Sequence, residues 1–320
     1  MARIAITGST GFVGGNIAEV LMNYGHDVIG LVRQEPVNPL PWKHELVDFS
    51  SVDAIAIASK GADAIVHCAI ANEFTKLVQD RPYAYDSYVG LTQRVTKAAN
   101  SINAQTVYIS TDWTMDGTQH LVPETDVGNP VNFYGYLKGL GEQVLRDLAP
   151  ETGAICRIGG VMGTHRTSPT GPRNQDVGFG YFVASLIEAL QSGDTFTVWG
   201  GDKVNKIATP SLASEIGAQI DRVISMKAHG TFHLVGDDAV ARMELAKTVC
   251  EVFELDASKL LESDPPESEL FPAAVPVDTS LGNASTKERL KLGKTSLVDL
   301  LKAFRRELET GNLEPMTKPL

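Results

Sequence analysis

A tyrosine and a lysine four residues apart are the side chains of this sequence best suited to acid–base chemistry. Tyr134 and Lys138 follow Pro130, and the proline predicts that a helix begins close by. Residues four apart share one face of a helix. A phenol with a pKa near 10 exchanges protons poorly at neutral pH, and an adjacent ammonium would stabilise its phenolate. About 0.4 such pairs are expected by chance in this composition, so the pair alone decides little.

A hydroxyl at a predicted strand end supplies a third group. The apolar segment Thr106–Ile109 predicts a strand, and Ser110 and Thr111 follow it. Ligands of open α/β sheets bind at the carboxyl ends of the strands. Hydride transfer to a carbonyl carbon leaves negative charge on the oxygen, to which Tyr134 could supply a proton and Thr111 a hydrogen bond. Thr111, Tyr134 and Lys138 are therefore the predicted catalytic set, and Lys138 is also expected to hold the ribose of a nicotinamide.

A glycine-rich turn lies between the first predicted strand and the first predicted helix. Its glycines stand three residues apart. Residues without a Cβ let the backbone approach a diphosphate closely, and a helix N-terminus supplies free N–H groups and partial positive charge. The alternative is a turn that only connects the two elements, because the spacing differs from the G-x-G-x-x-G fingerprint. The residues expected to bind a dinucleotide here are Gly8, Thr10, Gly11, Phe12, Val13 and Gly14.

The residue that follows the second predicted strand bears on the choice of cofactor. Chains that prefer NAD usually carry a carboxylate there, which accepts hydrogen bonds from the adenosine ribose, whereas this sequence has Arg33. A guanidinium can pair with a 2′-phosphate, which favours NADP(H), and a solvated arginine is the alternative. Asp48, followed by Phe49, is a candidate for the adenine amino group, although an exposed loop aspartate is nearly as good an interpretation.

Two longer segments resemble the extended short-chain dehydrogenase/reductase family, and more closely its dTDP-4-dehydrorhamnose reductase branch. The similarity is carried by Ser110–Gly117 and by Asn129–Lys138 followed by Gly141 and Glu142. It covers most of the chain, and both segments are more specific than the glycine turn. The resemblance implies a Rossmann-type fold, bound NADP(H) and a small-molecule carbonyl substrate.

The resemblance also implies roles for individual residues. It makes Thr111, Tyr134 and Lys138 the triad of the family. Val66–Ala69 resembles the strand end beside the cofactor, so that Cys68 and Ala69 line it and Cys68 is a small wall residue. Tyr88 stands where many relatives have an asparagine. The substrate contacts expected at the matching positions are Asp112, Trp113, Gly160 and Val161.

Short apolar segments alternate with amphipathic ones along the chain, a pattern typical of a parallel sheet covered by helices on both faces. The expected fold class is α/β: a Rossmann-type, doubly wound parallel sheet with a smaller C-terminal α/β substrate-binding lobe. The expected strands are Ile4–Thr7, Val28–Val32, Ala64–Cys68, Thr106–Ile109, Thr195–Trp199 and Thr231–Val235. The expected helices are Phe12–Tyr24, Ala84–Ser101, Tyr134–Leu148, Tyr181–Leu190, Leu212–Met226 and Ser296–Leu308.

The change of rhythm after Arg157 suggests how the chain divides. We expect residues 1–158 to form the NADP-binding Rossmann domain, with 207–236 returning to it. Residues 159–206 and 237–312 are expected to form the substrate-binding lobe, with the acidic segment 262–276 as a surface excursion. Residues 313–320, with two prolines, are expected to fray.

Composition narrows the partners. Hydrophobic residues make up 43% and charged residues 21%, as in ordinary globular proteins. The net charge of -11 disfavours nucleic acid and anionic membrane surfaces, and no segment is apolar enough to span a bilayer. Three cysteines without a C-x-x-C pair fit a reducing cytoplasm, and no Cys/His cluster suggests a metal.

Three functions remain open. The first is NADPH-dependent reduction of the 4-keto group of a nucleotide-linked deoxysugar. The second is reduction of a small ketone, aldehyde or other non-sugar carbonyl, which the few polar residues after Arg157 would tolerate. The third is an NADP-binding regulatory subunit without turnover, against which the intact catalytic set argues. A homodimer through the helices Ala84–Ser101 and Tyr134–Leu148 is expected by analogy alone.

Overall fold

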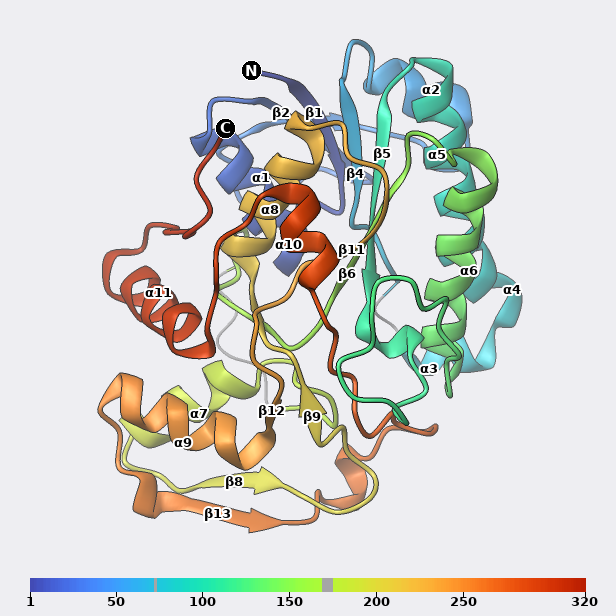
Figure 1. Cartoon of the computed structure of the whole chain (residues 1–320). Helices are drawn as coiled ribbons and strands as arrows, with labels where there is room; N and C mark the ends of the chain where they lie inside the picture. The colour runs from blue at the N-terminus through green and yellow to red at the C-terminus, as the bar shows by residue number, and fades with distance from the viewer. Residues whose placement is uncertain (72–73, 169–174) are drawn as a thin grey trace.

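A computed structural model describes residues 1–71, 74–168 and 175–320, and a seven-stranded sheet is its central element (Figure 1). All its strands are parallel, in the order β11-β6-β5-β4-β1-β2-β3. Most of these strands are buried on both faces, which explains why they read as continuous apolar runs. The strands are β1 (Arg3–Thr7), β2 (Asp27–Val32), β3 (Lys43–Leu46), β4 (Ala64–His67), β5 (Gln105–Thr111), β6 (Ala154–Ile158) and β11 (Gly230–His233).

Helices cover both faces of this sheet, as the alternating pattern predicts (Figure 1). One face carries α1 (Phe12–Asn23), α8 (Ala213–Ser225) and α10 (Ala284–Leu290), and the other carries α2 (Val52–Ala58), α5 (Leu91–Ser101) and α6 (Phe133–Leu148). Between β4 and α5 come α3 (Phe74–Gln79), α4 (Arg81–Tyr85) and a π-helical turn (Asp86–Gly90). The helix expected at Ala84–Ser101 is therefore helical but interrupted by the π-turn. The predicted α/β fold class is confirmed.

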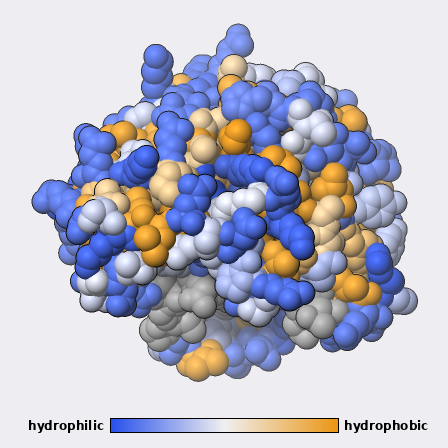
Figure 2. Space-filling view, turned by 90° about the horizontal axis from the view of Figure 1, so that it is seen from below, coloured by the Kyte–Doolittle hydropathy of each residue, from blue (hydrophilic) through white to orange (hydrophobic). Residues whose placement is uncertain are grey.

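A smaller group of elements, called here the second lobe, lies beyond the carboxyl edge of the sheet, at the bottom of Figure 1. It is formed by α7 (Phe182–Gln191), β8 (Phe196–Trp199), α9 (Arg242–Phe253) and β13 (Leu260–Ser263), with α11 (Leu297–Thr310) packed on α9. Short strand pairs connect it to the sheet: β7 (Val161–Met162) with β10 (Ser211–Leu212), and β9 (Ile207–Ala208) with β12 (Val240–Ala241). Seen from below, its hydrophobic residues form separate groups among hydrophilic ones (Figure 2).

One expectation about chain segments agrees with the structure and one differs from it. Most residues of the segment 262–276 are exposed, as expected for a surface excursion, although the segment begins in β13, which pairs with β8, and its Phe271 packs against Trp113. The C-terminal tail is held rather than frayed, because the Glu215 carboxylate accepts hydrogen bonds from the backbone N–H groups of Met316 and Thr317. Both segments find partners far away in sequence, which local composition does not reveal.

Some features are absent from residues 1–71, 74–168 and 175–320. None of their helices is long and apolar enough to cross a membrane. They bring together no group of three or more His, Cys, Asp or Glu side chains that could hold a metal ion. Cys68, Cys156 and Cys250 are free thiols.

Candidate functional site

The candidate site is built at the carboxyl edge of the sheet, where three neighbouring strands end. β1 ends at Thr7, β4 at His67 and β5 at Thr111, and β4 lies between the other two. The Thr7 hydroxyl lies 2.7 Å from the His67 Nδ1 and accepts a hydrogen bond from the Ala69 N–H at 3.2 Å. The sheet order therefore brings the glycine turn, Cys68 and Ala69, and Thr111 to the same edge.

The glycine turn requires glycine at two of its predicted positions. Gly8 has a φ of +70°, and a Cβ there would lie 2.8 Å from the Ala69 nitrogen. A Cβ on Gly14 would lie 2.2 Å from the Gly8 carbonyl oxygen. α1 begins directly after Gly11, which makes no side-chain cap to its first turn. The turn is thus a backbone cradle at a helix N-terminus, and its shape and polarity fit a diphosphate.

Residues 165–167, distant in the chain, lie against this cradle. The Thr167 hydroxyl donates to the Thr10 carbonyl oxygen at 2.6 Å. Arg166 forms a bidentate ion pair with Glu19 of α1, with N···O distances of 2.8 and 2.7 Å. The Phe12 ring lies 6.3 Å from the His165 ring. No local pattern in the sequence indicated this segment, because its partners are about 150 positions away in the chain.

The residues predicted for the adenosine end lie at the same sheet edge, after β2 and β3. Arg33 is exposed, and no ion pair is found for it among the described residues. Asp48 is also exposed and accepts hydrogen bonds from the Ser50 hydroxyl at 2.7 Å and the Ser50 N–H at 2.9 Å, which lower its pKa. Phe49 is half-buried, and its carbonyl oxygen accepts a hydrogen bond from Arg94. Asp48 thus makes the contacts of a turn-forming loop aspartate.

Tyr134 lies in the first turn of α6, next to Thr111. Asn132 caps this helix, because its side-chain oxygen accepts the Gly135 N–H at 2.9 Å. The Tyr134 ring meets the rings of Tyr88 and Trp113 edge-on, each at 6.1 Å between centroids. Burial raises the pKa of Tyr134 to about 12, a hydrogen bond with Thr111 opposes this rise, and the Asp112 carboxyl adds to it. The phenol therefore keeps its proton at neutral pH.

Lys138 lies one turn further along α6 and is only 4% exposed. Its ammonium donates a hydrogen bond to the Ile109 carbonyl oxygen at 2.5 Å and lies 4.3 Å from the centre of the Tyr108 ring. Burial lowers the pKa of Lys138 to about 7, while Cys68 and Glu142 act in the opposite direction. In this structure the ammonium donates its hydrogen bond to the backbone of β5, and the lowering of the Tyr134 pKa by Lys138 stays a prediction.

The four predicted substrate contacts are placed differently. Trp113 is half-buried, and its ring lies 5.4 Å from that of Phe271 as well as beside Tyr134. Asp112 is buried, and each of its carboxyl oxygens already accepts a hydroxyl hydrogen bond. A Cβ on Gly160 would contact Pro210 and Phe179. Val161 of β7 pairs with Ser211 of β10. Trp113 is thus the member of this set beside the phenol and open enough to meet a ligand.

A buried ion pair fixes α6 against the sheet behind the site. Glu142 accepts hydrogen bonds from Arg157 of β6 at 2.7 and 2.9 Å and from the Ser110 hydroxyl at 2.6 Å. Arg146 adds a third partner at 3.0 Å. Burial alone would raise the pKa of Glu142, but the contacts with Arg157 bring it below its ordinary value. These contacts set the register of Tyr134 and Lys138 relative to β5.

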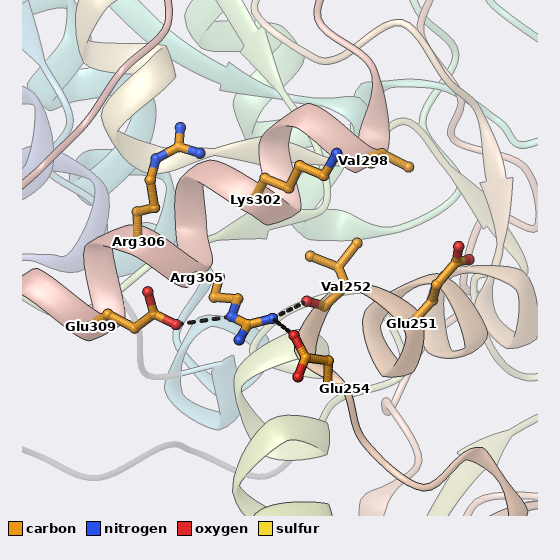
Figure 3. A pocket seen from close by; sticks show the side chains of 8 residues that line it. All are labelled: Glu251, Val252, Glu254, Val298, Lys302, Arg305, Arg306 and Glu309. Atoms are coloured by element: carbon orange, nitrogen blue, oxygen red, sulfur yellow. Dashed lines mark hydrogen bonds and ion pairs between the residues drawn. The ribbon is translucent and has the colours of Figure 1, made fainter.

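A hollow in the surface between α9 and α11 lies apart from this site (Figure 3). Arg305 spans it and donates hydrogen bonds to the Val252 carbonyl oxygen, Glu254 and Glu309. The ion pair of Arg305 with Glu254 links α11 to the end of α9. We therefore treat it as a helix contact of the second lobe.

Comparison with known proteins agrees with this geometry. The family model described as RmlD substrate binding domain matches residues 2–308. The chain belongs to this family. The resemblance to extended short-chain dehydrogenase/reductases is thereby confirmed, and the RmlD family is one of NAD(P)-dependent reductases with some relatives of other function.

Individual relatives of the RmlD type show this range. A protein described as probable low-salt glycan biosynthesis reductase Agl14, from Haloferax volcanii, is 26% identical over 93% of this chain and 96% of its own. Methionine adenosyltransferase 2 subunit beta of Bos taurus is 28% identical over 81% of this chain and 74% of its own. The structure of a dTDP-4-dehydrorhamnose reductase from Bacillus anthracis in complex with NADP has a TM-score of 0.78 and 21% identity, and covers 96% of this chain and 99% of that one. The structural likeness supports the fold.

Proposed function

We propose that this protein uses NADPH to reduce a carbonyl, and that the substrate is the 4-keto group of a nucleotide-linked deoxysugar. One observation carries the proposal: the Tyr134 phenol is hydrogen-bonded to Thr111 at the sheet edge that also carries the glycine turn. Proton donor, hydroxyl and diphosphate cradle therefore share one edge. That combination suits a carbonyl between a nicotinamide and a phenol.

The residues at the turn fit NADP(H). The backbone from Gly8 to Gly14 would hold the diphosphate, and Arg33 would pair with a 2′-phosphate. Cys68 and Ala69 would line the cofactor, and Lys138, which contacts the Ile109 carbonyl oxygen near the end of β5, would hold a ribose. When bound, the cofactor would supply the hydride.

The protein's own groups would handle the proton and the charge on oxygen. Because its pKa is raised to about 12, Tyr134 is protonated at neutral pH and can donate that proton to the substrate oxygen. Thr111 would share the charge that develops there. The rings of Trp113 and Tyr88 meet the phenol ring, Phe271 packs against Trp113, and these rings would limit the access of water.

The sugar-nucleotide substrate is supported by the likeness to the dTDP-4-dehydrorhamnose reductase structure. We propose residues 1–158 and 207–236 as the cofactor-binding unit and residues 159–206 and 237–312 as the substrate-binding unit. A small ketone or aldehyde is the alternative substrate, favoured by the aromatic rings of Trp113 and Phe271. A homodimer through α5 and α6 is proposed by analogy, and sedimentation would measure it.

The test is NADPH oxidation with a panel that contains dTDP-4-keto-6-deoxysugars, simple ketones and aldehydes. We expect the keto sugars to give the highest kcat/KM. Tyr134→Phe removes the proton donor and keeps the ring, so kcat should fall by roughly 10²–10⁴ while the Kd for NADPH stays nearly unchanged. Near wild-type turnover in that variant would contradict the role of Tyr134.

A second variant tests the cofactor. Arg33→Ser should weaken NADPH binding by about tenfold or more and leave NADH binding nearly unchanged, because only NADPH carries the 2′-phosphate. Titration of both cofactors by protein fluorescence would measure this. Equal losses for the two cofactors would remove Arg33 from the 2′-phosphate site.

A regulatory subunit is the second candidate function. It is favoured by the 28% identity to methionine adenosyltransferase 2 subunit beta. Under this alternative NADPH binds but is not oxidised by any member of the carbonyl panel. Binding without oxidation, together with co-purification of a catalytic subunit, would support it over the reductase.

A further inference from the structure

Asp112 is a buried carboxyl that connects the reacting hydroxyl to the segment after β13. The Thr111 hydroxyl donates to its Oδ1 at 3.1 Å, and the Thr279 hydroxyl donates to its Oδ2 at 2.6 Å. Asp112 and Thr279 are 167 positions apart in the chain. A contact of the second part of the chain is therefore transmitted through one carboxyl to Thr111.

The surroundings of this carboxyl are shaped to hold it. A Cβ on Gly159 would lie 2.8 Å from its Oδ2, so glycine leaves the space that the carboxyl fills. Thr279 is itself held by Asn205, whose side-chain oxygen lies 3.1 Å from the Thr279 hydroxyl. The Asn205 amide nitrogen donates to the carbonyl oxygens of Pro276 and Val277, which fixes the segment that carries Thr279. All three side chains, of Asp112, Thr279 and Asn205, are buried.

The hydrogen of Thr111 can point in only one direction at a time. An ionised carboxylate only accepts hydrogen bonds, so it draws the Thr111 hydrogen to itself and leaves Thr111 as an acceptor toward Tyr134. A protonated Asp112 can donate to Thr111 instead. The Thr111 hydrogen is then free to point at a substrate oxygen beside Tyr134.

We propose that Asp112 is a positioning residue that decides whether Thr111 donates toward or away from the reacting oxygen, and that Thr279 holds Asp112 for this task. The inference rests on the proposed carbonyl reduction. It goes beyond it because it makes the orientation of a catalytic hydroxyl depend on a contact between the sheet and the segment after β13.

The orientation is expected to change near pH 6. Burial raises the pKa of Asp112 to about 6, and the hydrogen bonds from Thr279 and Thr111 oppose that rise. Tyr134 is the titratable group that faces Asp112 from α6 and keeps its proton in this range. Thr279 and Gly159, from the other packed segments, carry no charge. The rate of reduction should therefore fall as the pH rises through about 6.

Asp112→Asn is the first test. Its amide nitrogen can donate to Thr111 at every pH, while its oxygen accepts from Thr279 in place of Oδ2. We expect kcat of the wild type to fall from about pH 5 to about pH 8, and kcat of the variant to stay flat. A folded variant that keeps the wild-type decline, or loses activity at every pH, would overturn the proposal.

Thr279→Val tests the contact from the second part of the chain. Loss of this donor should raise the pKa of Asp112, so the decline in kcat moves to higher pH, and Thr279→Ser should restore it. Thr286→Val is the matched control, because Thr286 is also buried and donates to a carboxylate, Glu124, away from the site. An unchanged midpoint in Thr279→Val, or an equal shift in the control, would contradict the role of Thr279.

A measurement without cofactor separates this inference from the proposed function. Because the carboxyl pKa is raised in the folded protein, the wild type should lose stability as the pH rises from about 4 to about 6. The Tm advantage of Asp112→Asn should grow over the same range and then level off. A constant Tm difference would contradict the inference about Asp112 alone, whereas a wild type that reduces no carbonyl would contradict the proposed function.

Discussion

Two successive turns in the middle of α6 each bury a charged side chain, and the two charges have opposite surroundings. Glu142 has Arg157, Arg146 and Ser110 as partners, and its pKa lies below the ordinary value. Lys138, one turn earlier, has the Ile109 carbonyl and an aromatic face, and burial lowers its pKa to about 7. A buried charge with ionic partners holds a structure together, whereas one without them can change its protonation near neutral pH. The Glu142 turn is thus held by ion pairs, whereas the Lys138 turn carries a group that can change its protonation state.

The largest effect on stability is expected from the buried ion pair of Glu142 with Arg157. Glu142→Gln leaves the buried guanidinium of Arg157 without its carboxylate, so the free energy of unfolding should fall by about 3–5 kcal/mol. Urea denaturation would measure the loss. A change below about 1 kcal/mol would mean that Glu142 and Arg157 contribute no more than a surface pair. The contrast between Glu142 and Lys138 would then disappear.

A substitution at Lys138 should change the stability in the opposite direction. Lys138→Met removes a charge that burial disfavours, so the protein should gain roughly 1–4 kcal/mol of stability below pH 7 while turnover is lost. The sign follows from the lowered pKa: the wild type gains stability as the pH rises from about 7 toward about 10, so the advantage of the variant shrinks over that range. Denaturation at about pH 6 and about pH 9 would reveal this. An advantage that grows with pH would show that the ammonium is well compensated.

A smaller effect is expected beside the phenol. The Tyr88 hydroxyl donates to the Ala71 carbonyl oxygen at 2.8 Å, and its ring meets Tyr134 edge-on. Tyr88→Phe keeps the ring and loses the hydrogen bond, so stability should fall by about 1 kcal/mol. Turnover should stay within about threefold of wild type, because the ring contact remains. A much larger fall in kcat at unchanged stability would indicate that the hydroxyl itself takes part in the chemistry.

The smallest effect on stability should come from Arg146, the more exposed partner of Glu142. Arg146 is partly exposed and bonds one oxygen of Glu142. Arg146→Gln should cost about 0.2–1 kcal/mol, and less at high salt, because water screens this pair. Thermal unfolding at low and high salt would measure it. A loss as large as that of Glu142→Gln would show that the contribution of Glu142 depends on Arg146.

The sequence predicted best what a few consecutive residues determine. The turn from Gly8 to Gly14 follows from backbone geometry between one strand and one helix, and its position is as expected. The spacing of Tyr134 and Lys138 likewise placed both on the first turns of α6. Alternating apolar segments were enough for the α/β fold class, because burial on both faces leaves a continuous apolar run in each strand.

The remainder depends on contacts between distant segments. Which acceptor Lys138 would reach depended on the β5 backbone, whose Ile109 carbonyl oxygen accepts its hydrogen bond. The π-turn at Asp86–Gly90 interrupts a segment that has the periodicity of one helix. Thr279 and its hydrogen bond to Asp112 lie in a region whose composition resembles a loop. Local spacing carries no information about such partners.

The C-terminal tail has a practical consequence for anyone who handles this protein. Its last residues are fastened by Glu215, by the Tyr24 hydroxyl on the Thr317 carbonyl oxygen and by Arg222 on that of Lys318. Tyr24 is the C-cap residue of α1, the helix whose opposite end forms the cradle. An affinity tag fused directly after Leu320 would disturb these hydrogen bonds. The tag should therefore be placed at the N-terminus or after a spacer.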